Sequence, residues 1–192
     1  MRKFSLDLAP PTAVPPTLSS YWVVPGLLLA GAYPGDPDPA EHDRKVKAFL
    51  GAGIRMFVNL MEEGETDHAG RPFVPYQDLA AKLCPEVACV RFAIPDLSAP
   101  TASQMAVILD AIDSAMEAGK PVYVHCWGGV GRTGTVVGCW MLRHRLATPS
   151  DVLDVLMRIR RQDKERRNRM SPETAAQQRF VRSWREEATP GA

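Results

Sequence analysis

Apolar residues along the chain gather in short continuous runs, separated by longer stretches of mixed polarity. Short runs bounded by Gly, Pro or polar residues predict buried strands, here at 21–24, 27–30, 54–60, 87–94 and 121–125. Helices are expected in the stretches between and after them: one ending near residue 50, then 76–83, 101–119, 131–146, 150–162 and 172–187. Strands that alternate with helices predict an α/β fold with a largely parallel central sheet.

The helix over 101–119 has the most complete pattern. Thr101 is expected to cap its start, Gln104 three residues later completes a capping-box pattern, and Gly119 ends it. Its apolar residues recur at helical spacing and form one face: Met105, Ile108, Leu109, Ile112 and Met116.

The first 20 residues have a different composition from the rest. They are rich in Pro, Ser and Thr, and we expect an extended arm rather than a packed element, with one domain over 21–188. Early prolines break any secretory leader, and the longest apolar stretch, 23–32, is too short to span a membrane. We therefore expect a cytoplasmic protein with reduced thiols.

Composition excludes several classes of protein. The 192 residues carry a net charge of +1, which argues against a general nucleic-acid binder. Four cysteines without a Cys-x2-Cys pair favour neither a disulfide scaffold nor a structural zinc site. We expect no metal and no cofactor, and the pattern carries no information on oligomeric state.

Charge is nevertheless unevenly distributed. Residues 141–192 have a net charge of +5 and residues 1–140 of −4, and the segment 157–170 alone holds seven basic and two acidic side chains. One interpretation is a solvated helix end and loop. The other is an electropositive rim that attracts phosphorylated substrates.

The segment 122–135 carries the chemistry. An apolar strand ends at Cys126, three glycines follow at 128, 129 and 131, and Arg132 precedes a helix. Glycines let successive backbone N–H groups converge on one point, and the helix N-terminus adds further N–H groups and a positive dipole end. An arginine can bind two phosphate oxygens with its planar fork. Cys126 is thus expected at the floor of an anion-binding cup, where adjacent cations and a helix N-terminus favour a reactive thiolate.

The pattern His125-Cys126-x5-Arg132-Thr133 resembles the signature of the cysteine-dependent protein-tyrosine phosphatase superfamily, and most closely its dual-specificity-like branch. The resemblance covers roughly residues 21–187. It implies four or five mostly parallel strands with helices on both sides, and a phosphocysteine intermediate. It also implies a phosphate-binding loop formed by Trp127, Gly128, Gly129, Val130, Gly131 and Arg132.

The same resemblance assigns further roles. Asp96, on a loop 30 residues before Cys126, corresponds to the proton donor for the leaving group. Thr133 corresponds to the hydroxyl that donates to the cysteine sulfur, and His125 to the residue that orients the loop. Gln177 corresponds to a glutamine that positions the hydrolytic water, although it could equally be a helix-surface residue. Glu173 stands where a second glutamine is often found, which is a departure from the pattern.

Other residues have weaker assignments. Cys139 is expected in the core, and Cys84 or Cys89 could be a redox partner of Cys126, although no spacing rule supports this. Trp127 either braces the loop or lines its rim. Phe73, Tyr76 and the loop 61–70 fall where the family's substrate-recognition loop lies.

The leading hypothesis is a phosphomonoester hydrolase of the protein-tyrosine or dual-specificity type, whose partner is a phosphorylated protein or a small phosphoester. The alternative is a phosphatase for non-protein substrates such as inositol phosphates or nucleotides. The five uncharged residues between Cys126 and Arg132 argue against polyanions, whereas the basic run at 158–169 favours them. A remote alternative is a non-catalytic phosphate-binding module, which would be expected to lack Cys126, Arg132 or Asp96.

Overall fold

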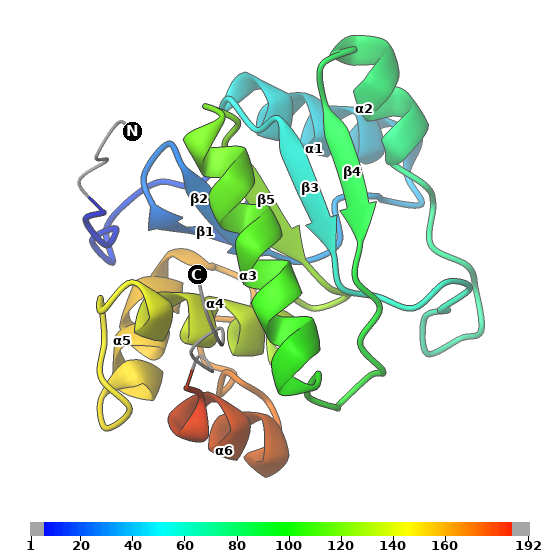
Figure 1. Cartoon of the computed structure of the whole chain (residues 1–192). Coiled ribbons are helices and arrows are strands. Elements are labelled where there is room, and N and C mark those ends of the chain that lie inside the picture. The colour runs from blue at the N-terminus through cyan, green and yellow to red at the C-terminus, as the bar shows by residue number, and fades with distance from the viewer. Residues whose placement is uncertain (1–5, 186–192) are drawn as a thin grey trace.

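The computed structural model describes residues 6–185 and contains a five-stranded sheet between two layers of helices (Figure 1). The strands are β1 Ser20–Val24, β2 Leu28–Gly31, β3 Met56–Asn59, β4 Ala88–Arg91 and β5 Val122–His125, in the spatial order β1-β2-β5-β3-β4. β1 pairs antiparallel with β2, and every other pair is parallel. The predicted fold class is confirmed.

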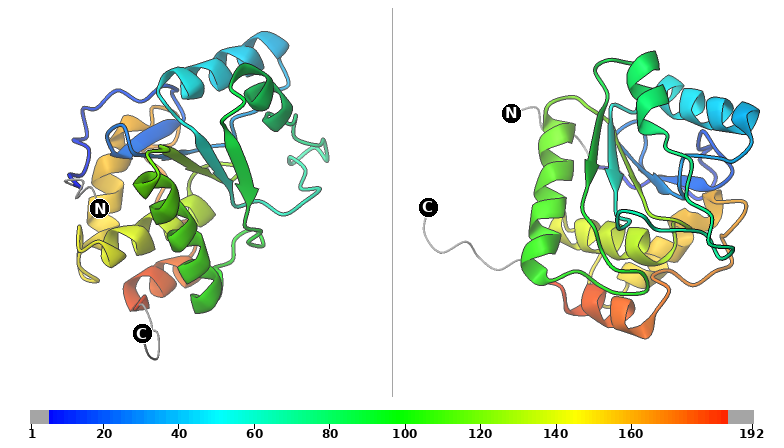
Figure 2. Two further views of the ribbon diagram at one scale, coloured as in Figure 1. Left: turned by 45° about the horizontal axis from the view of Figure 1, so that its top comes forward. Right: turned by 90° about the vertical axis from the view of Figure 1, so that its right-hand side faces the viewer.

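Strand residues alternate between the two faces of the sheet. On one face, Leu29, Phe57 and Tyr123 pack against α1 Pro39–Gly51 and α2 Gln77–Leu83. On the other, Ala30, Val58 and Val124 join a larger core. This core is covered by α3 Ala102–Glu117, α4 Gly131–Arg143, α5 Val152–Ile159 and α6 Ala175–Ser183. The right-hand view of Figure 2 shows the sheet between α3 and the α1–α2 pair.

Helix boundaries differ from the expected ones. The helix expected over 131–146 ends at Arg143, and the one expected over 150–162 ends at Ile159 and continues as a 3₁₀ turn over Arg160–Gln162. The last helix covers Ala175–Ser183, while the residues from 186 onward in its expected range lie outside the described residues. Thr174 is extended and caps α6, so the helix starts later than Pro172.

The capping box expected at α3 is only half formed. Thr101 Oγ1 accepts from the Gln104 backbone N–H at 3.1 Å, but the Gln104 side chain donates to the carbonyl of Ala93 instead of returning to Thr101. This side chain therefore ties α3 to the end of the preceding loop.

Residues 6–19 form no helix or strand, yet part of this segment packs on the domain. Ala9 is buried and its N–H donates to the carbonyl of Val23. The outer edge of β1 is also occupied, because the Gln162 amide accepts from Trp22 N–H at 2.9 Å and donates to Trp22 O at 3.0 Å. The 3₁₀ turn after α5 is thus fixed to the sheet. Among the described residues, no helix is long and apolar enough to cross a bilayer.

Candidate active site

The candidate site lies at the carboxyl ends of the parallel strands, where ligands bind in open α/β sheets. β5 ends at His125, and the next residue, Cys126, is 3% exposed. The chain then turns through Gly129, whose φ of +68° is favoured in glycine, and enters α4 at Gly131. A Cβ on Gly129 would collide with the backbone of Gly31 at the end of β2, so only glycine fits there.

Two hydroxyl groups hold this loop from inside. Thr133 Oγ1 donates to Cys126 Sγ at 3.1 Å, which is the contact that the resemblance implied. Ser171 Oγ donates to the carbonyl of Val130 at 2.7 Å. The loop is therefore fixed both at its sulfur and at the residue before α4.

Arg132 is almost fully buried and has several partners. Its Nη1 and Nη2 both donate to the carboxylate of Glu65, the second at 3.0 Å, and Nη1 also donates to the carbonyl of Ile94 at 3.1 Å. Nη2 lies 3.1 Å from Asp96 Oδ1. Burial by itself would lower the pKa of Arg132, but the hydrogen bond that it donates to Glu65 and the nearby anionic groups raise it. Its Nε is buried and has no hydrogen-bond partner among the described residues, which leaves one N–H available to an anion.

His125 supports the loop and does not line the pocket. Its Nδ1 lies 3.3 Å from the carbonyl of Cys126, and its Nε2 lies 2.7 Å from the hydroxyl of Tyr76. A carbonyl only accepts, so Nδ1 carries the proton and Nε2 accepts from Tyr76. Burial lowers the pKa of His125 to about 3, so the ring is neutral. Tyr76, which falls in the expected recognition loop, is instead buried behind the site.

Asp96 lies on a loop that is anchored to α6. Its side chain is 56% exposed, and the next residue, Leu97, is half-exposed with a φ of +60°. The carbonyl of Leu97 accepts from Thr174 Oγ1 at 3.3 Å, and that of Ser98 accepts from Gln177 Nε2 at 3.0 Å. The loop is thus anchored to α6 through the two residues that follow Asp96.

Gln177 is fully buried, so the interpretation as a helix-surface residue is wrong. Its Oε1 accepts from the N–H groups of Glu173 and Thr174, each at 3.1 Å, and completes a capping box with Thr174. A Cβ on Gly131 would lie 3.1 Å from the Gln177 amide atoms, so this side chain contacts the cysteine loop as well as the Asp96 loop. The amide therefore joins the two loops.

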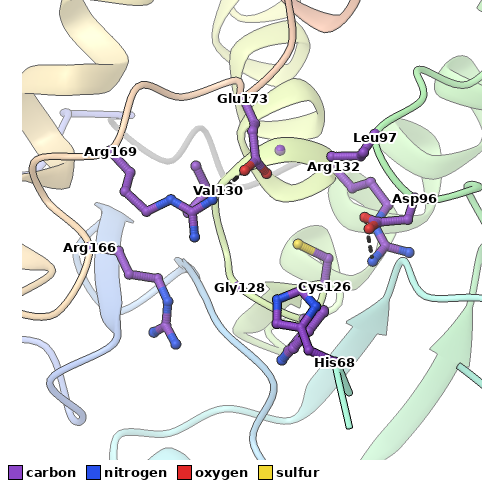
Figure 3. A pocket seen from close by; sticks show the side chains of 12 residues that line it. His68, Asp96, Leu97, Cys126, Gly128, Val130, Arg132, Arg166, Arg169 and Glu173 are labelled. Atoms are coloured by element: carbon purple, nitrogen blue, oxygen red, sulfur yellow. Dashed lines mark hydrogen bonds and ion pairs between the residues drawn. The ribbon is translucent and has the colours of Figure 1, made fainter. Parts of the chain in front are cut away.

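These residues surround a pocket of about 390 Å³ (Figure 3). Its lining comes from the cysteine loop, the Asp96 loop, the 61–70 loop and the segment before α6: His68, Asp96, Leu97, Cys126, Trp127, Gly128, Val130, Gly131, Arg132, Arg166, Arg169 and Glu173. Trp127 lines the rim, and its ring packs on His68 at 4.3 Å and Phe73 at 5.6 Å between centroids. Gly129 is absent from the lining because it faces β2.

Sequence reasoning missed Glu65 and His68 as individual residues, because an acidic loop gives no local signal for a partner 67 positions away. The basic segment 157–170 has two interpretations, a solvated surface or an electropositive rim of the site, and its arginines lie in different places. Arg166 and Arg169 line the pocket, whereas Arg158, Arg161 and Arg167 surround a separate hollow beside α5.

The remaining cysteines lie away from the pocket. Cys139 is buried in the core, and burial raises its pKa. Cys84 and Cys89 are free thiols that do not line the pocket around Cys126. Within residues 6–185, no group of three or more His, Cys, Asp or Glu side chains could hold a metal ion.

Comparison with known proteins assigns the chain to a family. The model of the Swiss Army Knife protein, DSP-PTPase phosphatase domain (PTP-SAK) matches residues 17–189. The chain belongs to this family. It is 30% identical over 129 residues to mouse protein tyrosine phosphatase domain-containing protein 1, an alignment that spans 64% of this chain but only 17% of the longer mouse protein.

Two solved structures place the fold. The active form of Tk-PTP superimposes with a TM-score of 0.62 at 25% identity, over 85% of this chain and 93% of that one. PTPMT1 in complex with PI(5)P gives a TM-score of 0.61 at 19% identity, over 82% of this chain and 88% of that one, and this likeness concerns the fold alone. The chain therefore has a phosphatase domain of the dual-specificity and tyrosine phosphatase type.

Proposed function

We propose that the protein hydrolyses phosphomonoesters through a phosphocysteine intermediate on Cys126. The observation that carries the proposal is the arrangement of Arg132. Arg132 lines the same pocket as Cys126, and its Nη atoms are held by Glu65 and Asp96, while its buried Nε has no hydrogen-bond partner among the described residues. A phosphate oxygen would supply that partner, and the loop amides and the start of α4 would bind the others.

The first step transfers the phosphoryl group to the protein. Cys126 Sγ attacks phosphorus, the S–P bond forms, and the P–O ester bond breaks. Asp96, exposed across the pocket, gives its proton to the leaving oxygen. In the second step water attacks phosphorus, Asp96 takes a proton from it, and the S–P bond breaks. Thr133 stabilises the thiolate that leaves, through its 3.1 Å hydrogen bond.

The pocket walls support two candidates for the finer substrate class. The His68–Trp127 wall suits an aryl phosphate such as phosphotyrosine, which favours a protein-tyrosine or dual-specificity phosphatase. Arg166 and Arg169 favour the second candidate, a small polyphosphorylated molecule. The relatives divide in the same way: the mouse protein is named for a protein tyrosine phosphatase domain, and PTPMT1 was solved with PI(5)P.

The test is hydrolysis of p-nitrophenyl phosphate with and without EDTA. We expect turnover that EDTA leaves unchanged, its loss in Cys126→Ser, and a fall of about 10²–10⁴-fold in Asp96→Ala with a poor leaving group such as phenyl phosphate. Cys89→Ser and Asp78→Ala are matched controls, because both residues are exposed and neither lines the pocket. Full activity in Cys126→Ser would rule out the phosphocysteine route.

A further inference from the structure

One wall of the pocket has no part in the proposed chemistry. Arg166 and Arg169 line it on the side opposite Asp96 (Figure 3). Arg166 Nε lies 3.9 Å from the position that a Cβ on Gly128 would occupy, so its guanidinium is directly against the cysteine loop. Two cations therefore lie beside the phosphate site in addition to Arg132.

A buried ion pair holds the backbone of the loop that carries these two residues. Arg160 is fully buried, and its Nη1 donates to the carbonyl of Arg169 at 2.7 Å and its Nη2 to that of Arg166 at 3.2 Å. Asp163 is also fully buried, and its Oδ1 accepts from the N–H groups of Glu165 at 3.1 Å and Arg166 at 2.8 Å. Arg160 Nη2 lies 3.5 Å from Asp163 Oδ2, which makes the two side chains an ion pair.

Such a pair contributes little to stability, because removing both charges from water costs about as much as their attraction returns. Its bonds instead fix the backbone of one loop, and that loop presents two arginines to the pocket. We propose that Arg166 and Arg169 bind a second phosphate of the substrate, so that the substrate is a small molecule with at least two phosphate groups. This inference rests on the proposed hydrolase activity of the same pocket.

The two arginines have displaceable partners. Arg169 pairs with Glu173 and Arg166 with Glu165 at 2.8 Å, and both carboxylates are at least one-third exposed. Exposed pairs of this kind are weak, so a phosphate dianion with several acceptor oxygens can replace a carboxylate. Glu173 lines the pocket itself and competes with the second phosphate for Arg169.

The experiment compares two aryl phosphates, one bearing a phosphonate on a short alkyl arm and the other its neutral diethyl ester. The phosphonate is not hydrolysed, so the ratio of kcat/KM for the two compounds measures recognition of the second anion. We expect Arg166→Ala and Arg169→Ala each to lower this ratio about 10-fold. Glu173→Gln is expected to raise it severalfold, because it frees Arg169 and removes a negative charge.

Arg167→Ala is the matched control, because Arg167 lies on the same loop but lines the separate hollow beside α5. A similar fall in Arg167→Ala, or an unchanged ratio in both Arg166→Ala and Arg169→Ala, would overturn the subsite while leaving the hydrolase proposal intact. Absence of turnover with either compound would instead overturn the hydrolase proposal. Two further substrates, an inositol bisphosphate in solution and a phosphoinositide in vesicles, distinguish a free ligand from a lipid headgroup. The substrate that is hydrolysed more slowly by Arg169→Ala than by wild type identifies the source of the second phosphate.

Discussion

Arg132 and Arg160 are both at most 2% exposed, yet their partners come from different parts of the chain. Arg132 binds a carboxylate and a carbonyl from loops far away in sequence and lies in the pocket lining. Arg160 binds the carboxylate of Asp163 and two carbonyls of its own loop, all within nine residues, and does not line the pocket. Burial of a guanidinium therefore does not distinguish a binding group from a structural one. The two roles are distinguished by where in the chain the partners of the guanidinium lie and by whether it lines a cavity.

The largest expected effect is on catalysis, when Arg132, the arginine in the pocket, is replaced. Arg132→Lys keeps the charge but loses the planar fork, so we expect kcat/KM for p-nitrophenyl phosphate to fall by about 10³-fold or more. A melting temperature within a few degrees of wild type would show that the variant folds. Activity within 10-fold of wild type would mean that the fork is not needed.

The next largest effect is on stability, when Arg160, the structural arginine, is replaced. Arg160→Met leaves Asp163 buried without its cation, and removal of one partner from such a pair typically costs about 3–5 kcal/mol in the free energy of unfolding. Burial already raises the pKa of Asp163, which is consistent with a carboxylate that is costly to keep charged. Urea titration measures the change.

The double variant Arg160→Met with Asp163→Leu separates the charge from the loop geometry. Replacing both charges by apolar groups is expected to restore part of the unfolding free energy, because no unpaired charge is left. Stability as low as that of the single variant would show that the hydrogen bonds to the loop, and not the unpaired charge, cause the loss.

A third buried basic side chain extends the comparison to pH. The pKa of His125 is about 3 in the folded protein and near 6.5 when unfolded, so folding favours the neutral ring. Its contribution to stability is complete above pH 6.5 and is lost as the pH falls toward 3. We expect wild type to lose about 2 kcal/mol more than His125→Phe between pH 6.5 and 5. Urea titrations of both proteins at these two pH values measure the free energy of unfolding. An equal loss of unfolding free energy in wild type and His125→Phe would contradict the burial argument.

The smallest expected effect concerns the partner of Arg132. Glu65→Gln keeps an acceptor but removes the charge that holds the guanidinium, and we expect kcat/KM to fall about 10-fold. Glu63→Gln, an exposed neighbour in the same loop, is expected to stay at the wild-type rate. Equal effects of the two substitutions would indicate a general change in charge rather than loss of this contact.

The sequence was sufficient for features that depend on local pattern. The apolar run before Cys126 forms a fully buried strand, and Thr133 contacts the sulfur as expected. The sequence was insufficient for predicting side-chain partners that are set by contacts between residues far apart in the chain. Thr101-x-x-Gln104 and Thr174-x-x-Gln177 have the same pattern, but only the second forms a complete capping box, because Gln104 finds the carbonyl of Ala93.

Gln177 illustrates the same limit at the site. Its position on a helix suggested exposure, but packing against Gly131 and Ser98 buries it. Nothing within a few residues of Gln177 indicates which loop will reach it.

The close approach of Gly129 to Gly31 has a practical meaning for protein engineering. A phosphate-binding loop transplanted from a relative will retain its shape only if the backbone at the end of β2 leaves the same room, and a side chain at residue 31 is blocked by the carbonyl of Ser19 and the hydroxyl of Tyr123. The two glycines should therefore be exchanged as one unit in any chimera.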